Sequence, residues 1–591
     1  MNARWRFLIC LLLVGVLYAG HVGLKLAKIY NHPTWDAQDE VGQFWSEFAF
    51  HYRFAKFFAT HADWSELSRD RQVQYPDTID DWAEFTVAME VPVGVLYRWL
   101  KPAVPLHVFV VWYGCLVSSL TLFGVFFLAR ALWRSAGAGV LASVLYATLY
   151  PSYGRTVKNL FLREDFAIPL IVFALYFTVC ALQDKRRWQQ IGAALFWLAA
   201  LASWHLTQFV LAVGVGAAVL VYLGKGETPR VPWFVLVLTA GSVVIPVLWA
   251  KQLYLSPVMC VVYALSLAVW INGGRKKATL VFAGWLVVFL AASFLLRKSY
   301  GEYAHVYQLF FYKLRYLGVK PEDPALLPWE ARCLWEGAFN TAPLGEWWHS
   351  LVWCGPLAVV GIVAALFERR SGNQLDSDGH RPPLQIFAVF TLMLVPLSWM
   401  VVRYFTFLGF AAAVVAAGLM TRRIWWRAAV IVAAGWQVAL LNFEPLDRTP
   451  VVPDNYKPLV KWINANTSTN AVFLASIAEA PVFLAHTGRP IILHSKFENW
   501  EIRERYRQFL AAVYGTPAEL VEFCRRYGAD YLVFDAGFFI TAKDSRRYKA
   551  DKLGELAPDC AAVLLVTQRV PEFEPVFSAN GYTILRVKAA P

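Results

Sequence analysis

The sequence contains few charged residues. Asp, Glu, Lys and Arg make up 16% of its 591 residues, whereas a soluble domain has about 25%. Hydrophobic residues reach 58%, and the mean hydropathy is +0.44. This composition excludes an ordinary soluble protein and predicts a chain that crosses a membrane several times.

Basic tracts with interleaved aromatic residues, as in RNA-binding proteins, are also missing. The formal net charge is nevertheless +13. Because the cytoplasmic loops of membrane proteins collect Lys and Arg, we attribute this charge to membrane topology. Nucleic acid is therefore not an expected partner.

Paired cysteine motifs are absent as well. None of the eight cysteines belongs to a CxxC pair, so neither a zinc site nor a redox motif of that kind is indicated. The first four lie in apolar runs, where cysteine acts as a packing residue. Cys333, Cys524 and Cys560 fall in stretches predicted to lie outside the membrane, where a Cys524–Cys560 disulfide could form.

Apolar runs fill most of the first 442 positions. A helix of about 20 residues crosses roughly 30 Å of hydrocarbon, so the sequence predicts a polytopic α-helical membrane protein with about thirteen spans. The predicted spans are 6–27, 105–130, 136–152, 166–183, 188–203, 205–223, 232–250, 255–271, 278–296, 349–367, 384–402, 404–420 and 427–442.

Basic residues lie in every second loop between these spans. If the N-terminal MNARWR is inside, the positive-inside rule makes those loops cytoplasmic, and an odd number of spans places the C-terminus outside. A cleaved signal peptide at the first run is an alternative that would still leave residue 30 onward outside. The basic loops contain Arg130 and Arg134; Lys185, Arg186 and Arg187; Lys225 and Arg230; Arg275, Lys276 and Lys277; Arg369, Arg370 and Arg381; and Arg422, Arg423 and Arg427.

Two long loops and the C-terminal region fall on the outer side. Residues 28–104 and 297–348 combine aromatics with helical spacing, which predicts helices at the membrane surface. After a Pro-rich linker, short apolar runs alternate with helical patterns, so residues 443–591 are predicted to form an extracytoplasmic α/β domain. This plan, with a transmembrane body over 1–442, resembles that of the GT-C glycosyltransferases, which use sugars carried on polyprenyl phosphate.

The first outer loop places a carboxylate among aromatic residues. In SEFAFHYRFAK, helical spacing puts Glu47, His51 and Phe54 on one face. Partial desolvation would raise the pKa of such a carboxylate and make it a better base at neutral pH. A surface helix with one solvated Glu is the alternative, and an interfacial charge would explain Glu90, which opens the next apolar stretch.

Cations occur on the outer side, where the positive-inside rule does not expect them. Arg155 and Arg163 stand in the short loop YGRTVKNLFLREDFAIP. Two interpretations are balanced. Arg163 could pair with Glu164 or Asp165 of the same loop, or the guanidinium groups could bind an anionic head group, because they grip phosphate oxygens in a fork.

Two further outer segments carry polar side chains. SWHLTQF contains Trp204, His205 and Gln208, and WMVVRYFTF contains Arg403. Trp and His commonly anchor a helix at the interface, and Arg can snorkel to it. An ionisable group at this depth is equally a hypothesis of function.

Together these residues supply a carboxylate and several cations on one face of the membrane. Transfer from a phosphate-linked sugar requires such a base, and cations stabilise charge on the departing phosphate. Because phosphate leaves readily, a general acid is dispensable.

The segments that carry these residues resemble the protein tryptophan C-mannosyltransferases, a GT-C family. The resemblance runs in order along most of the chain and implies inverting transfer of mannose from polyprenyl-phosphate mannose to carbon 2 of a tryptophan indole. The matching segments are SEFAFHYRFAK, QYPDTIDDWAEFTVAMEVPVGVLYR, RTVKNLFLREDFAIP, SWHLTQFVL, VVRYFTF, TGRPIILHSKFENWEIRERYRQFLAAVYG and GADYLVFD.

The resemblance also implies roles for individual residues. Glu47 is the expected general base, and Arg163 and Arg403 are expected near the donor phosphate, with Arg155 and His205 as further candidates. No metal or other cofactor is implied. The expected partners are the polyprenyl-phosphate sugar, an acceptor polypeptide with an exposed tryptophan and membrane lipid. A bacterial plasma membrane is the favoured location, and the ER membrane is the alternative. Candidates for contacting the acceptor or the sugar are His51, Tyr52, Glu90, Trp204 and Gln208.

Departures from the family pattern leave the acceptor open. Phe44-Trp45-Ser46 lacks the family's basic residue, and His51 and Arg53 replace smaller or phenolic side chains. An O- or N-glycosyltransferase is the nearest alternative, although the WWD run of oligosaccharyltransferases is missing. A transporter or scaffold is disfavoured because the chain has no inverted repeat and its unexplained polar residues gather on one face.

Overall fold

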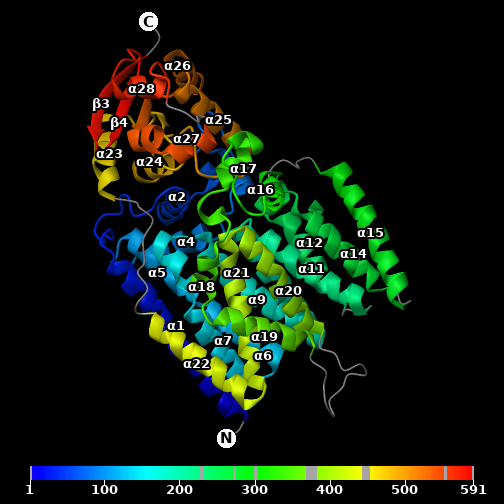
Figure 1. Ribbon diagram of the computed structural model, residues 1–591. Coiled ribbons are helices and arrows are strands. Elements are labelled where there is room, and N and C mark those ends of the chain that lie inside the picture. Colours follow the sequence, from blue (N-terminus) through cyan, green and yellow to red (C-terminus); the bar gives the residue numbers. More distant parts are fainter. Residues whose placement is uncertain are drawn as a thin grey trace.

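The computed structural model describes residues 3–225, 230–270, 274–297, 304–367, 382–441, 453–550 and 556–588. Much of the predicted Pro-rich linker and several residues of the basic loops lie outside these ranges. Figure 1 shows a helical body that carries a smaller part containing the strands, with the chain's C-terminus at its far end and the N-terminus at the opposite end of the molecule.

Long apolar helices build the body. By length and composition, seven helices of the described chain could cross a membrane, or eight if the bent pair α18–α19 is one span. Each predicted span coincides with a helix or with two consecutive helices, which confirms the polytopic helical fold; the number thirteen stays a prediction. The helices are α1 (Ala3–Tyr30), α5 (Leu106–Ser119), α6 (Thr121–Trp133), α7 (Ala136–Ala147), α9 (Arg163–Asp184), α10 (Arg187–Ser203), α11 (Thr207–Lys225), α12 (Pro232–Val244), α13 (Pro246–Ala250), α14 (Pro257–Ala268), α15 (Gly274–Leu296), α18 (Leu344–Leu351), α19 (Cys354–Leu366), α20 (Pro382–Met400), α21 (Phe405–Ala417) and α22 (Ile424–Leu440).

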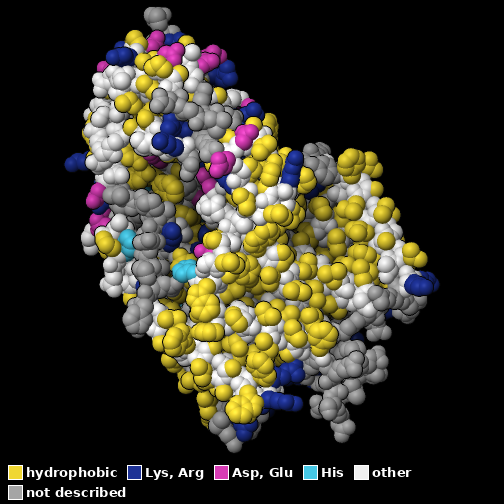
Figure 2. Space-filling model, viewed as in Figure 1, with side chains coloured by type: hydrophobic (Ala, Val, Ile, Leu, Met, Phe, Trp, Pro, Cys, Tyr) yellow, Lys and Arg dark blue, Asp and Glu magenta, His cyan; other side chains and the backbone are white. Residues whose placement is uncertain are grey.

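The surface of the body is apolar while its centre is closely packed. Figure 2 shows hydrophobic side chains over the helical body. Acidic side chains lie on the C-terminal part and near its junction with the body, whereas Lys and Arg also occur at the opposite end of the body. Leu12, Val287 and Leu295 are examples of large exposed hydrophobics, at 69%, 67% and 79% exposure, as lipid-facing positions require. Every residue of α21 is buried, so this helix is the core of the bundle.

Both long loops contain helices, as predicted. They include α2 (Glu47–Thr60), α3 (Asp81–Glu84) and α4 (Glu90–Leu100), then α16 (Ala304–Arg315) and α17 (Trp329–Leu334). Helices α2 and α4 meet at Gly94, where a Cβ would lie 2.5 Å from Phe58 Cβ and 2.6 Å from the Ala55 carbonyl oxygen. Glycine is thus what lets the two helices approach so closely, and this contact fixes the first residue of α4 beside α2.

A four-stranded sheet organises the C-terminal part. Its order is β1-β2-β4-β3, with β1 parallel to β2 and the other pairs antiparallel. The central strand β2 is buried on both faces over its first four residues. The strands are β1 (Phe473–Leu474), β2 (Tyr531–Asp535), β3 (Phe573–Ala579) and β4 (Tyr582–Val587), and the helices include α23 (Pro453–Asn466), α24 (Ala480–Thr487), α25 (Trp500–Tyr514), α26 (Pro517–Arg526) and α28 (Ala561–Val566).

The C-terminal part and the first long loop share one hydrophobic core. Phe50 and Phe54 of α2 belong to the same cluster of buried side chains as Val482 and Phe483 of α24 and Ile491. Figure 1 shows α2 between the C-terminal part and the helical body. The disulfide that the sequence left possible between Cys524 and Cys560 is not formed, because both thiols are free.

Candidate active site

Polar side chains from four distant segments meet at the junction of the body and the C-terminal part. Three of them stand at the first residue of a helix: Glu47 of α2, Glu90 of α4 and Arg163 of α9. The fourth is Lys496, in the segment between α24 and α25. Because each of these residues begins a helix, its side chain lies at a helix end, where it can meet side chains from other parts of the chain.

Glu47 forms an ion pair with the C-terminal part. Lys496 Nζ donates to Glu47 Oε1 at 2.5 Å, and His51 Nε2 lies 3.4 Å from the same oxygen. Burial alone would raise the pKa of Glu47, but the Lys496 ammonium outweighs it and holds this pKa well below its usual range. The sequence-based expectation of a raised pKa is therefore wrong for this arrangement, because it could not include Lys496. The Glu47 side chain remains 30% exposed, so a substrate can reach it.

His51 links Glu47 to a second carboxylate. Its Nδ1 lies 2.5 Å from Glu90 Oε1, and its Nε2 lies 3.1 Å from Lys496 Nζ. Burial, followed by the charges of Arg163 and Lys496, lowers the pKa of His51. These partners assign a neutral ring that donates from Nδ1 to Glu90 and accepts from Lys496 at Nε2.

Glu90 is a buried carboxylate and not an interfacial charge. Its side chain is fully buried, and Arg163 Nε lies 3.7 Å from its Oε1. Burial would raise the pKa of Glu90, but His51 and Arg163 hold it below the usual value. A buried charge of this kind persists only when it is paired.

Arg163 presents unused hydrogen-bond donors. Its side chain is 3% exposed, and among the described residues its Nε and Nη2 have no hydrogen-bond partner. Its ion pair is with Glu90, so the interpretation in which Arg163 pairs with Glu164 or Asp165 is wrong. A buried guanidinium with open donors at a helix N-terminus is suited to bind a phosphate.

The other two predicted arginines converge on Glu164. Its Oε1 accepts from Arg155 Nη2 at 2.9 Å and from Arg403 Nε at 2.7 Å. The Arg403 guanidinium carbon also lies 5.0 Å from the centre of the Trp204 ring, which stacks on Phe407. Trp204 is therefore a buried support for Arg403 and not an exposed interface anchor.

A small polar cavity adjoins these groups. Arg163 and Lys496 line it together with Glu498, and Lys251 Nζ donates to Glu84 Oε2 at 2.9 Å at its edge. Burial lowers the pKa of His205, which also lines the cavity, to about 3. The lining residues are Glu84, Phe85, Arg163, His205, Lys251, Lys496, Glu498 and Asn499.

Two predicted site residues, Tyr52 and Gln208, make other contacts. Tyr52 donates its hydroxyl to the Glu40 carboxylate and stacks on Phe44, so it belongs to a separate cluster. Gln208 lies in the first turn of α11, where its backbone N–H donates to the His205 carbonyl at 3.3 Å. Within the described ranges, no group of three or more His, Cys, Asp or Glu side chains is arranged to hold a metal ion.

Lys496 and Glu498 were missed by the sequence analysis. They stand in PIILHSKFENW, directly after an apolar run that enters the core at Ile491. A charged residue that directly follows a buried run lies next to the packed interior. This position is the sequence signal that could have identified Lys496 and Glu498 as site residues. Nothing in the sequence pairs this segment with Glu47, which is 449 residues away.

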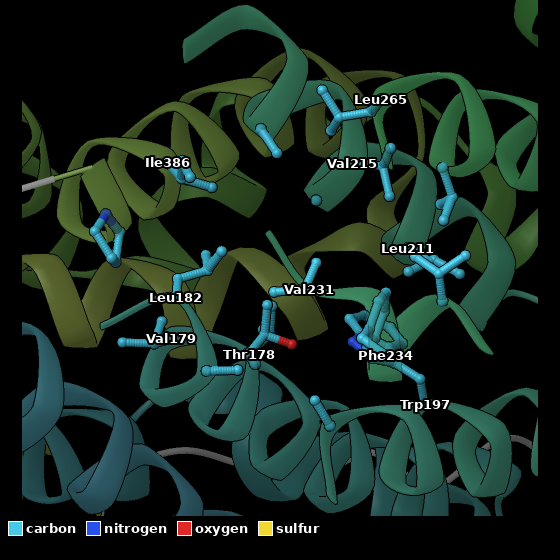
Figure 3. Close-up of a pocket in the computed structure, with 18 of the residues that line it drawn as sticks. Thr178, Val179, Leu182, Trp197, Leu211, Val215, Val231, Phe234, Leu265 and Ile386 are labelled. Atoms are coloured by element: carbon cyan, nitrogen blue, oxygen red, sulfur yellow. The ribbon is translucent and has the colours of Figure 1, made fainter. Parts of the chain in front are cut away.

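A larger cavity lies inside the helical body. It measures about 140 Å³, and its lining is apolar apart from a few residues such as Thr178 and Arg230 (Figure 3). Thr178 is fifteen residues beyond Arg163 on α9, which corresponds to about 22 Å along a helix axis. The described residues that line this cavity include no carboxylate, and their apolar character suits a hydrocarbon chain.

Comparisons with known proteins agree on family and fold. The family profile Dpy19 (Q-cell neuroblast polarisation) matches residues 36–311 and 388–587. The archaeal oligosaccharyltransferase AglB from Archaeoglobus fulgidus, in complex with an inhibitory peptide and a dolichol-phosphate, is similar at 14% identity and a TM-score of 0.62, over 92% of this chain and 71% of that one. An Archaeoglobus fulgidus oligosaccharyltransferase tethered to an acceptor peptide containing the NVT sequon is similar at 13% identity and a TM-score of 0.59, over 93% of this chain and 72% of that one. The comparison with curated proteins finds no match.

Proposed function

The chain belongs to the Dpy19 family, and from this premise we propose that it transfers mannose from polyprenyl-phosphate mannose to carbon 2 of a tryptophan in an exported protein. Family and fold together indicate a membrane glycosyltransferase of the GT-C type. The sugar, the polyprenyl-phosphate donor and the tryptophan acceptor are the proposal, as is a bacterial plasma membrane with the site on the outer face.

The observation that carries the proposal is that Lys496, which is paired with Glu47, lines the same small cavity as the open guanidinium of Arg163. Arg163 would bind the donor phosphate, and Arg403 and Arg155, which converge on Glu164, would add positive potential nearby. These cations are in place before the reaction, so they stabilise charge on the leaving phosphate without reorganising.

The proposed step balances as a single displacement. The bond between the anomeric carbon and the phosphate oxygen breaks as indole carbon 2 bonds to the anomeric carbon, with inversion. Polyprenyl phosphate leaves with the electron pair. The proton from indole carbon 2 passes to the Glu47 carboxylate, whose partly exposed side chain lets the acceptor approach. The AglB structure with a peptide and a dolichol-phosphate supports this pair of partners by analogy of fold alone.

Replacement of the proposed base tests the assignment. Glu47→Gln keeps the size of the side chain but cannot accept the proton, so transfer of labelled mannose should fall by about 10²–10⁴-fold. The exposed Glu504 of α25 gives the matched control, Glu504→Gln, which should retain wild-type transfer. Full turnover in the Glu47 variant contradicts the assignment.

The alternative is transfer to an oxygen or nitrogen of another acceptor. A carboxylate base suits those acceptors as well, so Glu47 does not distinguish the two functions. Fragmentation of the glycopeptide does: a hexose on tryptophan carbon survives and shows a cross-ring loss, whereas an O-linked hexose is lost.

A further inference from the structure

Lys496 holds the proposed base in the structure. Its side chain is 3% exposed, and its ammonium donates to Glu47 at 2.5 Å and lies 3.1 Å from His51 Nε2. The same side chain lines the polar cavity together with Arg163. Lys496 therefore stands between the carboxylate and the guanidinium that would receive the donor phosphate.

We propose that Lys496 is an exchangeable counter-ion: the donor phosphate bound at Arg163 draws the Lys496 ammonium away from Glu47 and so frees the carboxylate to act as a base. Glu47 is then available only when the donor is in place. This inference rests on the proposed function, since it assumes a lipid phosphate at Arg163.

The cavity itself requires a lining side chain to move. Its volume of about 10 Å³ is about the room that one water needs, so a phosphate cannot enter without displacing a neighbour. Arg155 and Arg403 are both bonded to Glu164. Lys251 and Lys496, which line the cavity, each have a flexible four-carbon stem and three rotatable donors. Of these two lysines, Lys496 is the one paired with the proposed base Glu47, whereas Lys251 is paired with Glu84.

The charges favour the exchange. In the arrangement shown, Lys496 balances Glu47, and Arg163 lies nearest to Glu90. A phosphate adds negative charge beside Arg163, and an ammonium that contacts it gains a charge-assisted hydrogen bond. Glu47, relieved of Lys496, would regain the higher basicity that its burial favours, which brings it closer to what catalysis near neutral pH requires.

A double-mutant cycle on binding tests this without any turnover. The probe is polyprenyl phosphate without sugar, titrated into the full chain in nanodiscs. Lys496→Met should weaken binding by about tenfold, the loss of one hydrogen bond to a charged group. Glu47→Gln should tighten binding by a similar factor, because Lys496 is no longer held by a competing carboxylate. In the background of Lys496→Met, Glu47→Gln should give no tightening.

Each other outcome decides against the inference. If Glu47→Gln tightened polyprenyl phosphate binding equally in the wild-type and the Lys496→Met chains, the cause would be simple repulsion between the carboxylate and the phosphate. If Glu47→Gln did not tighten binding in the wild-type chain, Lys496 would not leave Glu47 for the phosphate. Failure of polyprenyl phosphate to bind the wild type would overturn the proposed donor and the inference with it. Lys496→Arg keeps the cation, so Glu47→Gln should still tighten polyprenyl phosphate binding in the Lys496→Arg background. This variant keeps the test decisive if Lys496→Met folds poorly.

Discussion

At the scale of single residues, buried histidines make the site sensitive to acid. His494 is fully buried; its Nδ1 accepts from the Lys496 backbone N–H at 3.2 Å, and its Nε2 lies 3.3 Å from Gln74 Oε1. Burial, followed by the Lys496 charge, lowers the pKa of His494 to about 3. Between this value and about 6.5, the unfolded chain binds a proton here that the folded chain does not.

His494 should therefore make stability fall as the pH falls. Its contribution is complete above pH 6.5 and is lost towards pH 3, by up to about 1.4 kcal/mol per pH unit. His494→Gln keeps an acceptor but cannot titrate, so its melting temperature should depend less steeply on pH between 6.5 and 5. The exposed His61 provides the control variant, His61→Gln, for which the wild-type slope is expected. Identical slopes for wild type and His494→Gln would contradict the prediction.

Three residues that the sequence singled out lie in one polar cluster of the structure. Glu47, Glu90 and Arg163 meet because each begins a helix, and their types and spacing could be read along the chain. The ion-pair partner of each charged residue could not be predicted from the sequence. Arg163 has two carboxylates directly after it but pairs with Glu90, since the pairing depends on how α9 packs and not on sequence distance.

At the scale of elements, one close contact aligns the two helices that carry Glu47 and Glu90. A methyl group at Gly94 would lie 2.5 Å from Phe58 Cβ, so Gly94→Ala should push α4 away from α2 and cost about 1–3 kcal/mol, as overpacking does. The melting temperature should fall, and transfer should fall with it because the contact between His51 and Glu90 is displaced.

A glycine-to-alanine change elsewhere serves as a control, because it separates overpacking at Gly94 from the effect of alanine on helix propensity. Gly23 lies in α1, and a Cβ there would meet nothing within 4 Å. Gly23→Ala should leave stability unchanged or raise it slightly, since Ala favours a helix over Gly. If Gly94→Ala were as well tolerated as Gly23→Ala, the close contact would not control the alignment of α2 and α4.

Strands were predicted less completely than helices. The apolar run AVFLAS contains β1, and DYLVF and TILRV each cover all but one residue of β2 and β4. PIILH makes only a bridge between Ile491 and Phe473. Strand β3 was not predicted, because FEPVFSA includes Pro575 and a charged residue. It forms at the edge of the sheet, where a proline that cannot donate is tolerated.

At the scale of the whole molecule, the site depends on a contact that no local pattern reveals. The first long loop and the C-terminal part share a core, and the ion pair between Glu47 and Lys496 crosses that junction. From its own sequence pattern, the first long loop is predicted to form amphipathic helices and the C-terminal part an α/β domain. Only the folded chain shows that the C-terminal part completes the polar cluster.

The orientation of the molecule in the membrane is the remaining whole-chain prediction. Basic residues are concentrated in alternate loops, and the positive-inside rule then places those loops in the cytoplasm and the C-terminal part outside. Single cysteines at exposed Ser578 of β3 and exposed Arg186 before α10 sample the two sides. An impermeant maleimide should label Ser578→Cys in intact cells, and Arg186→Cys only after permeabilisation. The eight native cysteines are buried or half-buried, so the unmodified chain serves as a low-background control, and the reverse labelling pattern would place the site on the cytoplasmic side.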